Sequence, residues 1–346
     1  MVLKGVRFGD AKDVLRAEEI RLEAVSAVAL LFSETWRIDT LHVSGVDFGR
    51  ENVIALPGLL TPLSKADAPV SVRRFSFEKS SLALLGLRLE KLEGEFLSDP
   101  AGLGELKLHS ADRALSLSLK PASAGPLALS LEAYAWQPVP DAGIQIDSLS
   151  LSGVVKPQEL EVSSFDVRIL NGAFRGQGRV SKGEAYSVSG NLDFEHLNAG
   201  KLSEILAGGA MVQGEASGEI AFSARSPTWQ ELFARIEADG RFSFGRGSLR
   251  GIDFVEAVRR SGAAVQGGMT AFEQLSGRFR ARQGGMRLSD LSMGSGLMQS
   301  RGVLDIVSEG GLQGRFELQL KGSANQTRVP IVVNGTVKSP VVQMSR

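Results

Sequence analysis

Side chains that could carry out acid–base or metal chemistry are few and scattered in this sequence. His42, His109 and His196 stand far apart, and none has the H-E-x-x-H spacing of a zinc site. The chain has no cysteine, which excludes disulfides and thiolate-bound metal. The glycine-rich stretch 245–251 lacks the G-K-[ST] ending of a phosphate loop, and no G-x-S-x-G nucleophile motif occurs. We therefore expect a protein that is not an enzyme and needs no cofactor.

Arginines form a dense run in the last third of the chain. Residues 241–346 hold 15 basic and 7 acidic residues, although the whole chain is balanced at 39 of each. This balance disfavours nucleic acid as a partner. Two interpretations of the run stay open: a solvated surface, or a site for anionic phospholipid headgroups or an acidic partner. The candidates for such a site are Arg246, Arg250, Arg259, Arg260, Arg278 and Arg280.

Apolar residues alternate with polar ones along most of the chain from Val70 onward. The stretches 115–119 and 127–131 each place leucines on one face of an extended strand. Such a face could form the floor of a groove that holds acyl chains, and ordinary core packing is the alternative for each residue. The floor candidates are Phe242, Phe244, Phe316, Leu318, Leu320, Ile331 and Val333.

The pattern predicts a mainly β protein of about 20 to 24 strands joined by tight turns. An open sheet rarely exceeds about 10 strands without curling or splitting. The sheet must therefore curl into a trough or divide, and of these we expect a long, curled antiparallel sheet that forms an elongated, taco-like groove. Helical spacing is confined to short segments, at 24–32, 197–206, 226–233 and 251–260. Helices at such places could cover open sheet edges.

The last hundred residues carry a set of motifs in a fixed order. Residues 247–253 read G-x-L-x-G-I-D, and residues 270–279 read T-x-F-x-x-L-x-G-x-F. They are followed by RGVLDI at 301–306 and by P-x-x-V-x-G-T-x-x-x-P at 330–340. This region resembles the AsmA-like proteins of Gram-negative bacteria, relatives of bridge-like lipid transfer proteins with a repeating β-groove.

The resemblance implies a periplasmic protein that binds phospholipid acyl chains and helps lipid transport or outer-membrane lipid homeostasis. Its expected partners are the inner and outer membrane surfaces or other envelope proteins. Residues 2–9 and 38–45 look like the segment that follows an inner-membrane helix in this family, and that anchor is absent from this sequence. We accordingly expect three regions: an N-terminal segment at 1–65, a repetitive β-groove at 66–240, and an AsmA-like region at 241–346 that continues the groove.

Two other functions are compatible with a long amphipathic sheet. An outer-membrane protein assembly factor would bind client strands along its sheet edges and would have a filled interior. An adhesin-like solenoid would show a short repeat of fixed length, and the alternation here has no constant period.

Overall fold

The chain folds into a mainly β structure. The computed structural model describes residues 2–8, 15–22, 36–49, 70–84, 87–98, 104–121, 126–137, 145–207, 211–296, 298–307, 310–321 and 326–345. Strand accounts for 77% and helix for 7%, which confirms the predicted class. A mixed sheet of 22 strands, which is not closed into a barrel, is accompanied by a small sheet of three strands.

The chain divides into two compact units. Unit 1 holds residues 1–166 and 178–184, and unit 2 holds residues 167–177 and 185–346. The division falls within two neighbouring strands of the chain, β11 (Glu159–Ile169) and β12 (Gly172–Lys182).

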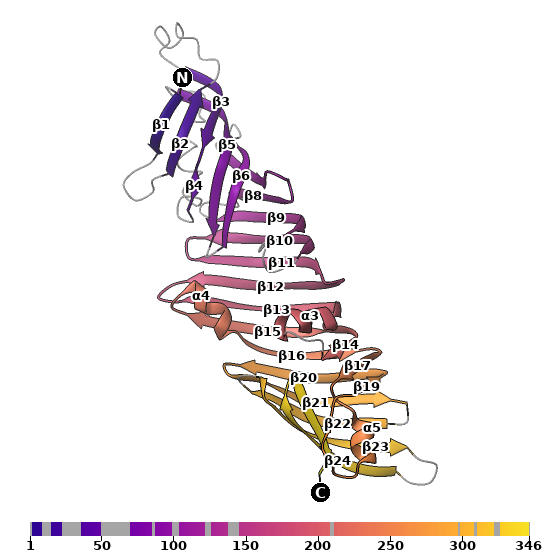
Figure 1. Cartoon of the computed structure of the whole chain (residues 1–346). Coiled ribbons are helices and arrows are strands. Elements are labelled where there is room, and N and C mark those ends of the chain that lie inside the picture. Colours follow the sequence, from indigo (N-terminus) through magenta and orange to yellow (C-terminus); the bar gives the residue numbers. More distant parts are fainter. Residues whose placement is uncertain are drawn as a thin grey trace. The chain divides into compact units, whose positions relative to one another are not determined.

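Unit 1 is built from strands that mostly pair with their neighbours in sequence (Figure 1). These are β1 (Val2–Phe8), β2 (Leu15–Leu22), β3 (Trp36–Ser44), β4 (Asp47–Phe48), β5 (Val70–Leu84), β6 (Leu87–Ser98), β7 (Gly104–Ser110), β8 (Leu115–Pro121), β9 (Leu127–Trp136) and β10 (Ile146–Lys156). The pairs β1–β2 and β2–β3 are antiparallel, as are the successive pairs from β5–β6 to β9–β10.

The prediction of a purely antiparallel sheet is wrong at one place. Strands β3 and β4 both run parallel to β5. A parallel pair needs a connection of about a dozen residues or more, and the stretch of chain between Phe48 and Val70 is long enough to supply it.

Alternation places the leucines of β8 and β9 on one buried face. In β8 the buried residues Leu115, Leu117 and Leu119 stand opposite buried residues of β9, while the residues between them are more exposed. Phe75 and Phe96 add rings to the same core, with centroids 6.1 Å apart. Burial of one face is the main force that holds these strands in register.

Unit 2 continues with antiparallel strands and adds the small sheet. Its main-sheet strands are β13 (Tyr186–Asn198), β15 (Glu215–Ser226), β16 (Glu237–Phe244), β18 (Val265–Gln266), β20 (Gln274–Arg282), β21 (Gly285–Ser295), β22 (Met298–Val307), β23 (Leu312–Lys321), β24 (Gln326–Thr336) and β25 (Ser339–Met344). They pair in this order, except that β18 joins last, on β25. The small sheet holds β14 (Val212–Gln213), β17 (Gly247–Arg250) and β19 (Met269–Phe272).

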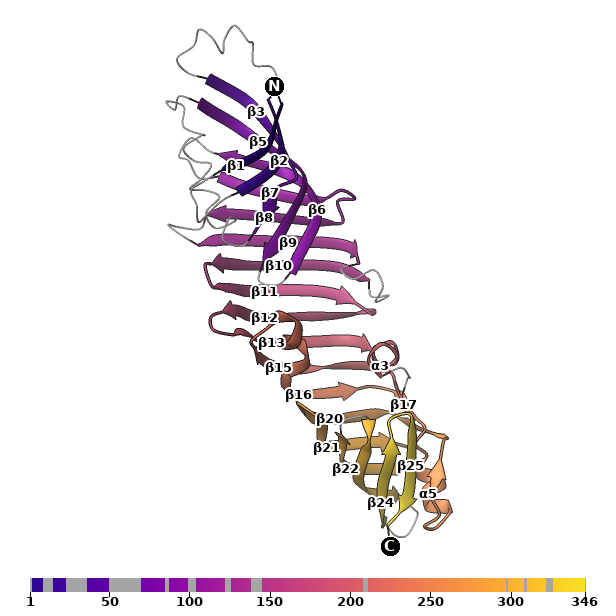
Figure 2. The ribbon, with the colours of Figure 1, turned by 60° about the vertical axis from the view of Figure 1, so that its left-hand side comes forward.

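The described residues of unit 2 include three short helical segments. They are α3 (Ala199–Ala207), α4 (Trp229–Leu232) with the 3₁₀ turn η2 (Phe233–Arg235), and α5 (Phe254–Arg259). Figures 1 and 2 show α3 and α5 toward one margin of the strands and α4 toward the other. These segments agree with the predicted helical stretches of this region, and the stretch predicted at 24–32 lies outside the described residues.

Phenylalanine rings lie against glycines of neighbouring strands on one face of the main sheet in unit 2. We call this the inner face; it carries Phe194, Phe242 and Phe279. Gly218 stands opposite Phe194 on β13 and Phe242 on β16, and a Cβ built on Gly218 would come within 2.7 Å of the Phe194 ring. Gly240 stands opposite Phe279 on β20, and a Cβ built on Gly240 would come within 2.5 Å of the Phe279 ring. The absence of a side chain gives each ring its place, an arrangement known to stabilise glycine in sheets.

Unit 1 contains the same arrangement at Gly104 and Phe96, where it can be tested by mutation. All the atoms nearest to a Cβ at Gly104 belong to the Phe96 ring, so Gly104→Ala forces that buried ring to move. We expect a loss of about 1–3 kcal/mol in the free energy of unfolding. A Phe96→Leu background should remove most of this cost, as measured by a double-mutant cycle in urea.

Gly294→Ala is the matched control, because a Cβ there meets nothing within 4 Å. Additive effects of Gly104→Ala and Phe96→Leu would contradict the ring-on-glycine account.

Candidate functional site

An apolar cavity of about 500 Å³ lies within unit 2. One wall is the inner face of the main sheet, with side chains from β12, β13, β15, β16 and β20 to β23. The rest of the wall comes from α3, β14, β17 and the start of α5. Its volume is within the range of about 300–1,000 Å³ that is typical of small-molecule sites.

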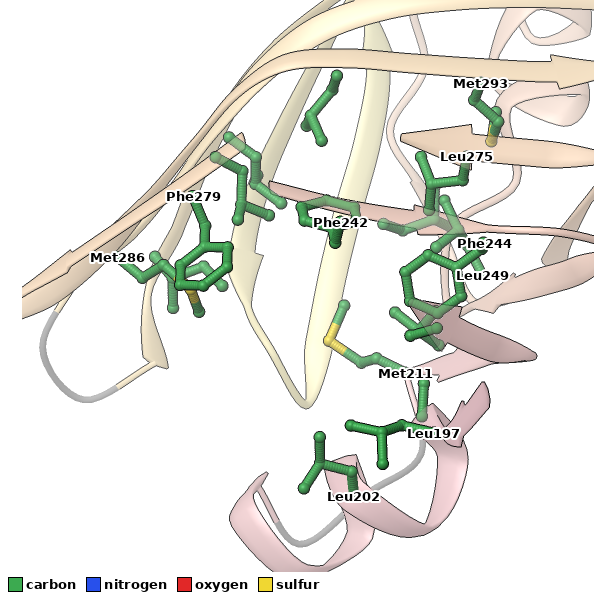
Figure 3. Close-up of a pocket in the computed structure, with 18 of the residues that line it drawn as sticks. Leu197, Leu202, Met211, Phe242, Phe244, Leu249, Leu275, Phe279, Met286 and Met293 are labelled. Atoms are coloured by element: carbon green, nitrogen blue, oxygen red, sulfur yellow. The ribbon is translucent and has the colours of Figure 1, made fainter. Parts of the chain in front are cut away.

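The cavity wall is apolar with one exception. Figure 3 shows Phe242 between a group formed by Phe279 and Met286 and a group that contains Phe244 and Leu249. Ser300 is the exception, and the other lining residues are Phe174, Phe194, Leu197, Ala199, Leu202, Met211, Val212, Ala216, Ile220, Ile252, Phe254, Leu275, Leu288, Leu291, Met293, Leu304, Ile306, Leu312 and Phe316.

The period of two along β16 explains how its rings reach the cavity. Phe242 and Phe244 face inward, while Arg241 before them and Ser243 between them are exposed. The Phe242 and Phe244 rings meet edge to face, with centroids 5.8 Å apart. Phe244 packs in the same way on buried Phe272 of β19. The rings therefore connect the main sheet to the small sheet.

A buried hydroxyl fixes the start of α5. Thr270 Oγ1 donates to the carbonyl oxygen of Ile252 at 2.8 Å and accepts from the amide of Phe254 at 3.1 Å. Asp253 caps the helix, since its carboxylate accepts from the amide of Glu256 at 2.9 Å. The predicted helix at 251–260 thus begins later, at Phe254, because the cap occupies the preceding residue.

The predicted floor residues fall into two groups. Phe242, Phe244 and Phe316 line the cavity. Four residues do not line it: Leu318, Ile331 and Val333 are fully buried in the core of unit 2, and Leu320 is partly buried against that core.

Other cavity residues were missed by the sequence interpretation although their pattern is similar. Phe279 lies between two arginines of β20 and Met286 lies two residues before Leu288 of β21, so both follow the period of two. Leu202 and Met211 carry no such signal, because they come from a helix and from a loop.

The predicted arginines differ in how far their charge is balanced. Arg280 donates to Asp239 at 2.6 Å and Arg278 lies 3.6 Å from Asp290. Arg259 and Arg260 share a single acid, Glu256, at 3.3 and 2.8 Å. Arg250 contacts the side-chain amide of Gln213, and Arg246 forms no ion pair within the described part of the chain. Excess positive charge therefore remains around α5 and β17.

The ion pairs lower the pKa of two acids. Hydrogen bonds from Arg280 and Arg282 hold the pKa of Asp239 below its ordinary value of 3.8. The hydrogen bond from Arg260 lowers the pKa of Glu256 in the same way. Both acids are therefore charged at neutral pH.

The histidines belong to no group of potential metal ligands in the described residues. His196 is exposed, with Nδ1 3.1 Å from a carboxylate oxygen of Glu215. No group of three or more potential metal ligands occurs in the part of the chain that the structure describes. Among these same residues, no helix has both the length and the apolar character needed to cross a membrane.

Comparisons with protein-family models, with curated proteins and with solved structures found no match to this chain. The resemblance to AsmA-like proteins therefore rests on the sequence motifs alone.

The ion pairs of Asp239 with Arg280 and Arg282 make the stability of the fold depend on pH. Because its folded pKa lies below 3.8, the stabilisation is present above that pH and is lost as the pH falls through the folded value. We expect Asp239→Asn to be less stable than the wild type at pH 7 and to approach it in acid. Urea unfolding over the pH range measures both.

Asp290→Asn is the matched control, because it removes one longer ion pair, with Arg278, from another strand of the same sheet. An Asp239→Asn deficit that stays constant into acid would contradict this role.

Proposed function

We propose that this chain is a non-enzymatic lipid-binding conduit that helps phospholipid transport or outer-membrane lipid homeostasis. The observation that carries the proposal is the cavity of unit 2, whose wall offers hydrocarbon contacts and a single hydroxyl. The resemblance to AsmA-like proteins supports the same function independently, since it rests on motifs and not on the cavity.

The chemistry of the wall favours acyl chains over polar ligands. Transfer of each methylene from water is worth about 0.8 kcal/mol, so a hydrocarbon tail gains binding energy at every position. No charged side chain lines the cavity, so a phosphate or other ionic headgroup has to stay outside. A uniform apolar surface lets a tail slide, as a conduit needs.

We propose that the sheet curls so that its inner face forms a groove that extends beyond the cavity. In unit 2, Leu192 lies on this face outside the cavity wall and is only partly buried. In unit 1, Leu149 and Leu151 of β10 face the same way as buried leucines of β9 and are partly buried too. Partly exposed apolar residues at inward positions are what an open groove requires.

The envelope location and partners follow from the resemblance. We propose a periplasmic protein, attached to the inner membrane in its full-length form, that exchanges acyl chains with the inner and outer membrane surfaces. The excess positive charge around α5 and β17 is suited to anionic headgroups.

The first test is lipid retention by Phe242→Asp. A carboxylate on the cavity wall should lower bound phospholipid about tenfold, because a charge must be removed from water wherever a tail binds. Native mass spectrometry of protein purified gently from a bacterial envelope counts the lipids, and parallel extraction identifies them.

Ser243→Asp is the matched control, since it adds the same charge to the exposed face of the same strand. A wild-type chain that is folded and free of lipid would instead favour the strand-binding assembly factor.

The second test concerns the α5 surface. Reversing both charges in Arg259→Glu/Arg260→Glu should weaken binding to anionic vesicles by at least about tenfold, since each charge near such a surface contributes about 1 kcal/mol. Vesicle flotation at two salt concentrations measures the effect.

Arg235→Glu, which breaks a comparable ion pair with Glu231 beside α4, should leave vesicle binding unchanged. Equal binding of the double variant and the wild type would exclude this surface.

A further inference from the structure

Ser300 is an unusual residue in the cavity wall. It lies on β22 opposite two buried apolar residues, Met293 and Leu318, and is itself only 2% exposed. Its Oγ has no hydrogen-bond partner among the described residues. A buried hydroxyl without a partner has lost its hydrogen bonds to water and gained none, which destabilises the ligand-free protein.

The other buried hydroxyl side chains of the described structure do have partners. Thr270 makes two hydrogen bonds, and the Ser80 hydroxyl donates to the carbonyl oxygen of Glu78. The Ser226 hydroxyl accepts from the amide of Thr228, and the Ser248 hydroxyl lies 3.4 Å from the side-chain amide of Gln213. The missing partner of Ser300 is therefore specific to the cavity wall.

We infer that Ser300 Oγ donates a hydrogen bond to an uncharged carbonyl oxygen of the ligand, such as that of an acyl ester. This inference rests on the proposed function and specifies the chemistry of the ligand. The hydroxyl can donate, and the hydrocarbon around it excludes competing water.

An ionised carboxylate does not fit this position. No lysine, arginine or histidine lines the cavity, so a buried carboxylate would have no counter-charge. An ester carbonyl costs far less to bury and needs a single donor. The cavity therefore distinguishes an esterified acyl chain from the corresponding free fatty acid anion.

Competition against diphenylhexatriene fluorescence tests the inference in the full chain. The competitors are methyl dodecanoate and dodecane, each supplied from the same cyclodextrin carrier. The ratio of their apparent affinities is compared between the wild type and Ser300→Ala, so that the carrier's own preference cancels. We expect Ser300→Ala to reduce the ester-to-alkane ratio about three- to tenfold, the effect of one hydrogen bond.

Two further readouts separate a ligand contact from a structural role. Ser300→Ala should keep or raise the melting temperature of the ligand-free protein, because it removes an unpaired hydroxyl. The carbonyl stretch of bound ¹³C-labelled methyl dodecanoate should lie at lower frequency in the wild type than in Ser300→Ala. Ser292→Ala, on the exposed face of β21, is the control and should change none of these quantities.

The outcomes distinguish this inference from the proposed function. An unchanged ester-to-alkane ratio, or an unchanged carbonyl frequency, would overturn the role of Ser300 and leave hydrocarbon binding intact. If neither competitor displaces the probe from the wild type, the lipid-binding proposal itself fails. Ser300→Cys keeps the size of the side chain with a weaker donor and should give an intermediate ratio, which guards against a packing effect of Ser300→Ala.

Discussion

Packing of phenylalanine rings against glycines is the interaction on which the inner face of unit 2 depends. Gly218 receives the Phe194 ring and Gly240 receives the Phe279 ring from a neighbouring strand. Each ring covers backbone that a bare glycine would expose, and it lies low against the sheet. A Cβ at either glycine would collide with that ring and also with a backbone carbonyl oxygen of a neighbouring strand, at 2.1 Å for Gly218 and 2.4 Å for Gly240. The cavity therefore requires glycine and phenylalanine together, in register across strands.

The outer face follows a different physical rule. Asp239 of β16 meets Arg280 of β20, and Glu219 of β15 meets Arg241 of β16. Exposed ion pairs of this kind add little to stability. Their greater effect is on register, because a slip by one residue would place these charges on the apolar face. The two faces thus specify the same strand pairing.

The period of two was enough to predict a mainly β class and which residues share a strand face, and it could not show which face is inward or what covers each face. Phe316 and Leu318 both lie on the inward face of β23, yet one lines the cavity and the other is fully buried. The difference comes from elements elsewhere in the chain that pack over each residue.

The arginine run was equally visible in the sequence. The pairing of Arg280 with Asp239 was not, because it joins residues 41 positions apart.

The helical segment at α5 meets two requirements of the last strands of the sheet. An exposed edge strand invites pairing with other chains, and β25 is covered by β18 and contacted by α5. Gly251, with φ +79°, brings the chain against Pro340 of β25, where a side chain would collide. The same turn directs Phe254 onto the Phe316 ring, with centroids 5.3 Å apart, at the cavity wall. The change of period from two to that of a helix therefore occurs where the chain both covers the edge strand and supplies a ring to the cavity wall.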